Sequence, residues 1–203
     1  MRFLDFYKEY RSLGLISVHQ IHALGTGPDS NALGRWVRQG LLIRLRSGFY
    51  AFPESAEEPG FAYYAANRIY RPSYISLHSA LAFYGMIPEA VVQVTSVSSL
   101  KTCAFKSPAG EFSYKSVRKS LMFGYEARPD GRLSVLWATP EKALLDLLYL
   151  YPFYRTQSDF EELRLDEDYM RSSLNWDRLM EFAEKADSAA LLSRIKILEE
   201  VYR

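Results

Sequence analysis

Residues 42–52 carry the pattern of a basic β-hairpin, which constrains the amino-terminal fold more than any other feature of the chain. Apolar and polar side chains alternate in the first half of this segment, with the period of two expected of a strand. Ser47 and Gly48 form a turn pair, and a mainly aromatic run then returns as a second strand. The alternation predicts that Arg44 and Arg46 share one face of the hairpin, opposite its apolar side chains.

Three short helices are expected before the hairpin, because apolar residues recur there at helical spacing between start and stop signals. Glycines end the first and third helices, and a Gly-Thr-Gly-Pro turn follows the second. The predicted helices run from Phe3 to a stop at Gly14, from Val18 to Leu24 behind a Ser17 cap, and from an Asp29 or Ser30 cap to Gln39, where Gly40 ends the third.

The third predicted helix has a polar face. Asn31, Arg35 and Arg38 follow one another at i, i+4 and i+7 and therefore line up along one side of the helix. In a DNA major groove, arginine reads guanine in bidentate fashion, and an amide such as that of Asn31 or Gln39 can read adenine. A solvated helix face explains the same residues, and for any single arginine it is the simpler interpretation.

Three helices followed by a basic hairpin predict a winged helix-turn-helix domain over residues 1–53. In that fold the second helix of the pair lies in the major groove, and the hairpin contacts phosphate groups or the minor groove. Winged helices also serve as protein-docking modules, so an adaptor that binds no DNA is the competing hypothesis. The predicted DNA-binding residues are Asn31, Arg35, Arg38, Gln39, Arg44 and Arg46.

The 203-residue chain is nearly neutral, with 25 Lys+Arg against 24 Asp+Glu, but its charge is unevenly distributed. Residues 1–53 hold seven basic and three acidic side chains, whereas residues 150–203 hold eight basic and twelve acidic ones. This gradient favours a local anion-binding patch near the amino terminus. The nearly neutral total charge excludes a protein that is basic over its whole surface.

A single cysteine excludes a disulfide framework and any multi-cysteine metal site. No apolar run reaches the roughly 18 residues that a membrane-spanning helix needs, and the first residues lack the pattern of a signal peptide. We therefore expect a cytoplasmic protein with no membrane partner.

Residues 54–203 are predicted to form a second, α+β domain. Several short strands separated by turns indicate a mostly antiparallel or mixed sheet with flanking helices, and a doubly wound sheet is not expected. A polar linker is expected over residues 53–59. The predicted helices cover residues 61–70, 77–84 behind a Ser76 cap, a stretch from a Thr139 cap to a stop at Pro152, 163–165 and 176–203. The predicted strands cover residues 91–97, 100–105, 112–117, 121–125 and 133–137, with turns at 108–110 and 129–131.

An ordered set of motifs resembles AbiEi-type antitoxins, which are predicted transcriptional regulators of phage-defence systems. The motifs are Tyr74–Glu89 (YISLHSALAFYGMIPE), Val94–Val97 (VTSV), Phe112–Tyr114 (FSY), Phe123–Tyr125 (FGY), Ala138–Asp146 (ATPEKALLD) and, as a wing, Gly40–Tyr50 (GLLIRLRSGFY). The resemblance covers roughly residues 10–150. It implies that a winged helix represses a toxin–antitoxin operon, and that the protein counters a nucleotidyltransferase-like toxin encoded next door. No stable complex with the toxin is implied, which is the type IV arrangement.

Candidate catalytic or metal-binding residues are few. His19 and His22 are one helical turn apart, but no third ligand lies near them in the sequence. His78 lies on a predicted helix, where a partly buried, hydrogen-bonded histidine is the simpler interpretation. Cys103 has no recognisable base partner and is interpreted as an inert thiol. We expect no metal and no cofactor.

A metal-dependent nuclease is the enzyme hypothesis to consider, because DNA-binding domains are often joined to DNA-cleaving domains. Such enzymes need clustered carboxylates, usually with a nearby lysine. The candidates are Glu111 with Lys115, and Glu141 with Lys142 and Asp146. Glu141 is already explained as a first-turn helix residue, and Asp146 lies on a helix, so we expect a protein that is not an enzyme.

Scattered positive charge in the second domain gives it a possible backbone-binding role toward RNA or DNA. A solvated sheet edge explains the same residues, together with the polar stretch 96–102, and is the preferred interpretation. The residues concerned are Arg68, Arg71, Lys115, Arg118 and Lys119.

Overall fold

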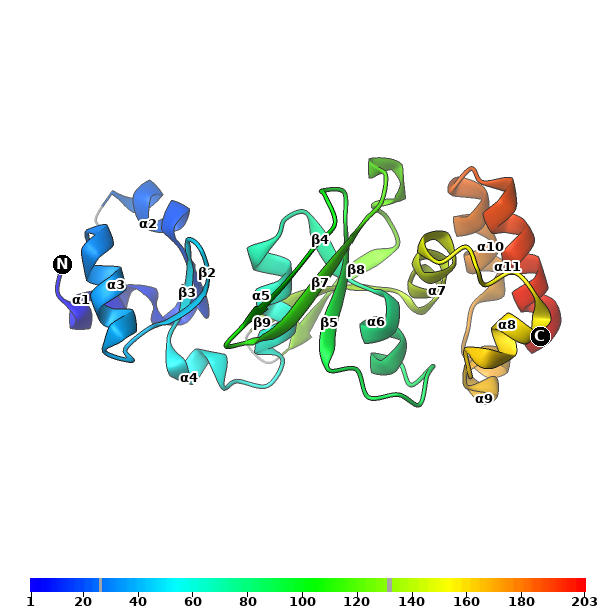
Figure 1. Ribbon diagram of the computed structural model, residues 1–203, viewed down its shortest axis with the longest axis horizontal. Helices are drawn as coiled ribbons and strands as arrows, with labels where there is room; N and C mark the ends of the chain where they lie inside the picture. Colours follow the sequence, from blue (N-terminus) through cyan, green and yellow to red (C-terminus); the bar gives the residue numbers. More distant parts are fainter. Residues whose placement is uncertain (26, 131–132) are drawn as a thin grey trace.

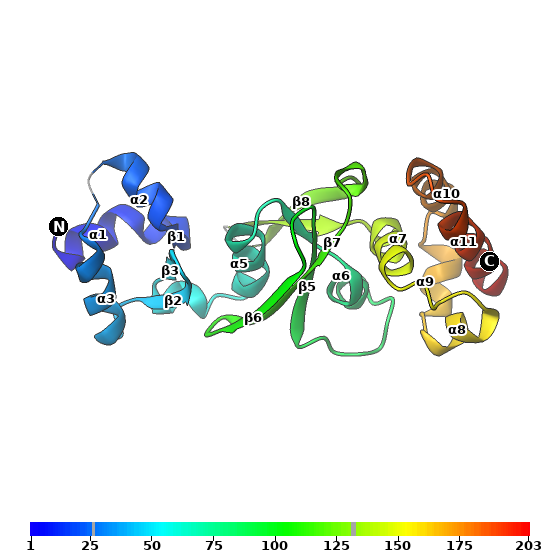
Figure 2. The same cartoon turned by 45° about the horizontal axis from the view of Figure 1, so that its top comes forward.

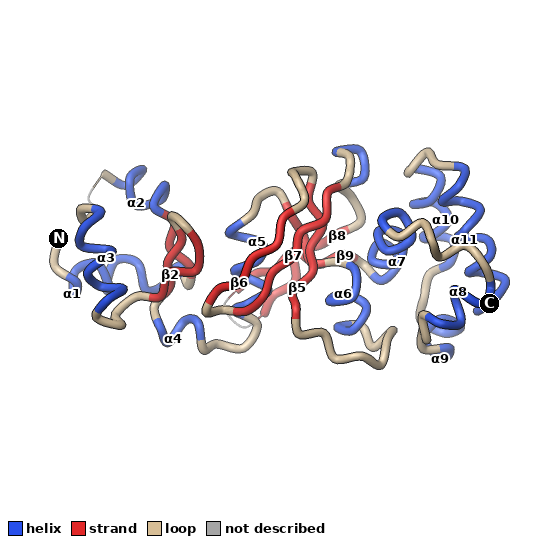
Figure 3. The backbone as a smooth tube through the Cα atoms, viewed as in Figure 1, coloured by secondary structure: helices blue, strands red, loops and turns tan. Residues whose placement is uncertain are grey.

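The computed structural model describes residues 1–25, 27–130 and 133–203. Figure 1 shows an elongated arrangement in three parts: a small unit at the amino-terminal end, a sheet in the middle, and a group of helices at the carboxyl-terminal end. Figure 3 shows the strands gathered in the middle part, apart from the small sheet of the first unit. The protein is therefore α+β, as the sequence predicts.

Many of the elements overlap predicted ones. The helices are α1 (Phe3–Tyr10), α2 (Val18–Leu24), α3 (Ser30–Arg38), α4 (Pro53–Ala56), α5 (Phe61–Ile69), α6 (Leu77–Phe83), α7 (Pro140–Leu150), α8 (Gln157–Glu162), α9 (Glu167–Ser172), α10 (Trp176–Lys185) and α11 (Ala189–Tyr202), with 3-10 turns η1 (Arg11–Leu13) and η2 (Lys119–Leu121). The strands are β1 (Leu15–Ser17), β2 (Ile43–Arg46), β3 (Phe49–Ala51), β4 (Ser73–Ile75), β5 (Gln93–Ser98), β6 (Cys103–Ser107), β7 (Gly110–Ser116), β8 (Tyr125–Asp130) and β9 (Leu133–Ala138). The elements α4, α8, α9, β1 and β4 were not predicted, and the helix predicted over residues 176–203 is divided into two. We call residues 1–52 the N-terminal unit.

The N-terminal unit has its own hydrophobic core, formed largely by aromatic side chains. The ring of Trp36 on α3 lies 5.0 Å from the ring of Phe6 on α1, centroid to centroid. Both predicted caps are present: Ser17 forms a capping box at the start of α2, and the carboxylate of Asp29 accepts a 2.7 Å hydrogen bond from the backbone N–H of Ala32 at the start of α3.

Two features around the small sheet differ from the prediction. β1 is not among the predicted strands, because three residues are too few for a periodic pattern. It pairs antiparallel with β3, which pairs with β2, so the strand order is β1-β3-β2. The predicted polar linker over residues 53–59 is also wrong in part, since Pro53 begins the short helix α4.

The middle sheet has six strands in the order β6-β7-β5-β4-β9-β8. β5 with β7 and β4 with β9 are parallel, and the other pairs are antiparallel. β6 therefore pairs with β7 and does not extend β5. Figure 2 shows α5 and α6 on opposite sides of this sheet, and α6 also contacts α7. The mixed sheet with flanking helices is confirmed.

The segment after β7 corrects another prediction. Residues 121–125 do not form a strand: the 3-10 turn η2 comes first, and β8 begins only at Tyr125. Between them Gly124 has a φ of +70°, a conformation that favours glycine. A Cβ atom added at Gly124 would lie 2.9 Å from the Phe182 ring and 3.1 Å from the Lys142 side chain. Of the turn predicted at 129–131, residues 129 and 130 belong to β8, and Gly131 lies outside the described residues.

The carboxyl-terminal helices α8 to α11 are held against the middle part by α7. This helix begins as predicted, with the Thr139 side chain accepting from the backbone N–H of Lys142 and Pro140 in the first turn. It is buried along most of its length. The predicted helix at 163–165 is wrong, because α8 and α9 lie on either side of those residues. None of the described helices is long and apolar enough to cross a membrane.

Candidate nucleic-acid interface

α3 has one buried and one exposed side, as its sequence pattern predicts. Leu33 and Trp36 are 4% and 3% exposed and belong to the core of the N-terminal unit. The opposite side chains, Asn31, Arg35 and Arg38, are all exposed. Because they are spaced by four and three residues, they form one row along the helix surface.

Gln39 and Gly34 lie next to this row of exposed side chains. Gln39 is exposed at the carboxyl-terminal end of α3, where its backbone N–H closes the last turn on the carbonyl of Arg35. A Cβ atom added at Gly34 would come within 3.7 Å of the Arg38 guanidinium. This is an ordinary contact, so a side chain at position 34 would lie beside the Arg38 guanidinium without a clash.

The two hairpin arginines have different surroundings. Arg44 on β2 is exposed, whereas Arg46 is half-buried. The Arg46 guanidinium lies over the ring of Phe105 at 4.5 Å from its centroid, and over Tyr70 at 5.6 Å. The register of β2 against β3 shifts between Arg44 and Arg46. Such a bulge re-aims a side chain, and here Arg46 contacts the six-stranded sheet and not the solvent beside Arg44.

Three exposed arginines of α3 and the hairpin have no acidic partner within the part of the chain that the structure describes. Among the described residues, none of Arg35, Arg38 and Arg44 makes an ion pair within the molecule. Their positive charge is therefore not cancelled by neighbouring carboxylates. An uncompensated cationic row on a rigid helix attracts polyanions in an ionic-strength-dependent way.

Lys142 and Asp146 form a buried ion pair on α7, with side chains 0% and 1% exposed. The second carboxylate oxygen, Oδ2 of Asp146, accepts hydrogen bonds from the hydroxyls of Tyr74 at 2.9 Å and Ser76 at 2.8 Å. Burial raises the pKa of Asp146, while Lys142 and the two hydroxyl donors act in the opposite direction. Ser76 was expected to cap α6, but its side chain makes no cap bond and is used here instead.

These contacts bear on the residues considered for a nuclease. Both oxygens of Asp146 are engaged inside the core, and Glu141 is buried nearby on α7. Glu111 is far from them, on β7, where it pairs with Lys106 of β6 at the surface. Within the described ranges there is no group of three or more His, Cys, Asp or Glu side chains arranged to hold a metal ion.

The histidines and the cysteine lie apart from one another. His19 and His22 are both exposed on α2. His78 is half-buried on α6, and burial lowers its pKa despite the opposing charge of Glu89. Cys103 is half-buried on β6.

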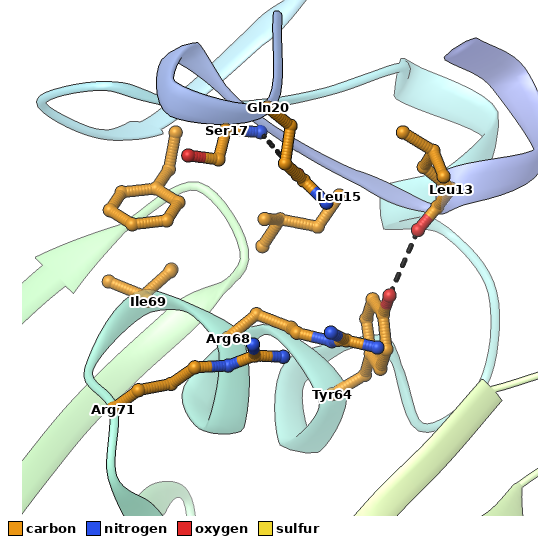
Figure 4. A pocket seen from close by; sticks show the side chains of 9 residues that line it. Leu13, Leu15, Ser17, Gln20, Tyr64, Arg68, Ile69 and Arg71 are labelled. Atoms are coloured by element: carbon orange, nitrogen blue, oxygen red, sulfur yellow. Dashed lines mark hydrogen bonds between the residues drawn. The ribbon is translucent and has the colours of Figure 1, made fainter. Parts of the chain in front are cut away.

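Arg68 and Arg71, two of the scattered cations that were expected at a solvated sheet edge, lie together in the structure. Both line a pocket between α5 and the N-terminal unit (Figure 4). Their spacing of three residues carries no helical signal, because α5 ends at Ile69 and Arg71 lies beyond it. No local pattern indicates that the N-terminal unit covers these two residues, so only the tertiary structure reveals the pocket.

Comparison with known proteins gives no further assignment. No model of a known protein family matches the chain, and no curated protein matches it. The resemblance to AbiEi-type antitoxins therefore stays a prediction from the motifs.

Proposed function

We propose that this protein is a transcriptional regulator whose N-terminal unit is a winged helix-turn-helix that binds operator DNA. The single observation that carries the proposal is the exposed row on α3, whose two arginines make no ion pair among the described residues and which is followed in the chain by the hairpin β2–β3. The order of elements supports it, because three helices followed by an antiparallel hairpin are the arrangement expected of that fold.

In this proposal α3 lies in the major groove. Arg35 and Arg38 read guanine edges, and the amides of Asn31 and Gln39 bind adenine or neighbouring phosphates. Arg44 contacts the phosphate backbone from the hairpin. Arg46 holds the hairpin against the six-stranded sheet through Phe105, and in this way it fixes the position of Arg44 without reaching the DNA.

The antitoxin role rests on the motif resemblance. We propose that the protein acts in the cytoplasm and represses its own operon. It also counters a nucleotidyltransferase-like toxin that is encoded by the adjacent gene, without forming a stable complex with that toxin. Coexpression of the full chain with the adjacent gene product tests this role. An Arg35→Ala/Arg38→Ala variant should lose repression of a reporter while still rescuing growth, whereas failure of the wild-type chain to rescue growth contradicts the antitoxin role.

The DNA-binding role is tested by gel shifts on the protein's own upstream region. The Arg35→Ala/Arg38→Ala variant should lose binding, while Arg171→Ala should not, because Arg171 is an exposed arginine of α9 at the other end of the molecule. Equal binding by wild type and the double variant refutes the groove assignment. No salt-sensitive shift with any duplex, specific or random, would instead favour the protein-docking adaptor.

A further inference from the structure

A pocket of about 410 Å³ lies where the N-terminal unit meets α5. The N-terminal unit contributes residues of η1, β1, α2 and β3 to its wall. Arg68 near the end of α5 and Arg71 just after that helix line the other side. Beside it, the Tyr64 hydroxyl of α5 donates a 2.9 Å hydrogen bond to the carbonyl of Leu13 (Figure 4). This bond fixes the two walls relative to each other. The volume is within the range of small-molecule sites.

Hydrogen-bond donors converge on this pocket from both sides. Figure 4 shows the guanidinium groups of Arg68 and Arg71 side by side, with the Gln20 side chain extending toward them from the N-terminal unit. The Gln20 carbonyl oxygen, Oε1, already accepts from the backbone N–H of Ser17 at 3.1 Å. The amide nitrogen of Gln20 is therefore the end left to face the pocket, and it only donates.

No carboxylate among the described residues pairs with the guanidiniums of Arg68 and Arg71. The Arg68 guanidinium lies 5.0 Å from the centroid of the Tyr64 ring, which orients it but supplies no charge. Burial, and next the like charge of Arg68, lower the pKa of Arg71. A bound anion would relieve this repulsion.

We propose that this pocket binds a phosphate group, which Arg68 and Arg71 hold through charge-assisted hydrogen bonds with help from the Gln20 amide. The ligand class is a small phosphorylated molecule whose less polar part lies against the apolar wall formed by Leu15 and Ile69. Paired guanidiniums suit phosphate because their planar forks match its oxygens. Since both walls contribute, the ligand would join the N-terminal unit to the sheet. This site is independent of the proposed DNA contact of α3.

Phosphate titration of the full chain tests the site. Sodium phosphate is added at constant pH and ionic strength, with chloride as the balancing anion, and backbone amide shifts are followed by NMR. Saturable shifts should appear at Ser17 and Gln20. Arg71→Gln should weaken phosphate binding roughly tenfold or more, as expected for losing a charge-assisted contact. The matched control Arg171→Gln removes one exposed positive charge elsewhere and should bind phosphate as the wild type does.

A second measurement separates a free ligand from the phosphates of bound DNA. The salt slope of DNA binding is compared between wild type and Arg68→Gln/Arg71→Gln. An unchanged slope assigns the pocket to a small phosphorylated molecule, and a slope reduced by about two assigns it to the DNA backbone. The proposal is overturned if wild-type shifts do not saturate, or if Arg71→Gln binds phosphate as tightly as wild type. Arg35→Ala/Arg38→Ala should retain the phosphate shifts, so failure of DNA binding leaves this test intact.

Discussion

The guanidinium of Arg46 lies 4.5 Å from the centroid of the Phe105 ring and joins the hairpin of the N-terminal unit to strand β6 of the six-stranded sheet. Arg44, two residues earlier on the same strand, is exposed and has no such partner. Two arginines that the sequence pattern treats as equivalent are thus given separate tasks by the register shift between them.

Alanine at position 46 should therefore mainly lower stability, whereas alanine at position 44 should mainly weaken DNA binding. Arg46→Ala should lower the free energy of unfolding by about 1–2 kcal/mol. It removes a partly buried cation–π contact, and it also removes the packing of the arginine's methylene groups. Arg44→Ala should change stability by less than about 0.5 kcal/mol, as expected for an exposed side chain, but should weaken DNA binding. Urea unfolding and gel shifts on both variants check this pair. An equal loss of stability in the two variants would contradict the assignment.

The salt dependence of DNA binding should reflect the cations that remain free. If Arg35, Arg38 and Arg44 each neutralise one phosphate, log K should fall with log[salt] with a slope of about −2.7 per protomer. Arg46 is not counted, because its guanidinium is occupied by aromatic rings. Fluorescence anisotropy over a series of salt concentrations measures the slope. Arg44→Ala should reduce the slope by about one. Arg46→Ala should reduce it by no more than that, because Arg46 acts only through the position of Arg44.

Base recognition should depend on α3 itself. Arg35→Ala should cost roughly 1–3 kcal/mol on the operator and relax the preference for one base pair, because a bidentate arginine–guanine contact is lost. Competition gel shifts with operators changed one base pair at a time measure this preference. An affinity loss that is the same for every sequence would assign Arg35 to the phosphate backbone instead.

The buried ion pair on α7 should matter for stability. Asp146→Asn leaves the charged Lys142 side chain buried without its partner, which should cost roughly 3–5 kcal/mol in the free energy of unfolding. The double variant Lys142→Met/Asp146→Asn should recover much of that loss, because it removes the stranded charge and keeps an acceptor for Tyr74. Urea unfolding checks both. Magnesium- or manganese-dependent plasmid nicking that Asp146→Asn abolishes without loss of stability would support a nuclease instead.

Alkaline pH should destabilise the fold through Tyr84. Burial raises the pKa of Tyr84 from 10.0 to about 12, although Arg128 opposes the shift, and its hydroxyl donates a 2.8 Å hydrogen bond to the carbonyl of Ala138. Because the folded state keeps this proton to higher pH than the unfolded state does, stability is present below pH 10 and is lost as the pH rises toward 12. Urea unfolding between pH 9 and 11 (roughly the accessible part of that window) should show a shallower decline for Tyr84→Phe than for wild type.

Local signals predict the N-terminal unit well. The caps Ser17 and Asp29, the helix α3 and the hairpin are set by residues close together in the sequence, and the structure contains each of them. The exposed row on α3 follows from helical spacing alone. The strand β1 could not be predicted in the same way, because its three residues form a strand only through pairing with β3.

Contacts between distant residues limit prediction elsewhere. Ser76 stands at the position of a helix cap, yet its hydroxyl donates to Asp146, 70 residues away. The backbone N–H of Ser79, which a cap would bond, donates instead to the Thr95 hydroxyl at 3.0 Å. The surroundings of Arg46 depend on β6, and the pairing of Arg68 with Arg71 in a pocket depends on the position of the N-terminal unit. Such relationships exist only in the folded chain, so neither periodicity nor capping signals could reveal them.

Because the molecule is elongated, one partner can bind at each end at the same time. α3 lies in the part of the chain at one extremity, and α11 lies at the other, with the six-stranded sheet between them (Figure 1). A duplex bound to α3 leaves the helices α10 and α11 uncovered. Simultaneous occupancy of both extremities is sterically open, so any communication between them has to pass through the sheet and not through direct competition for space.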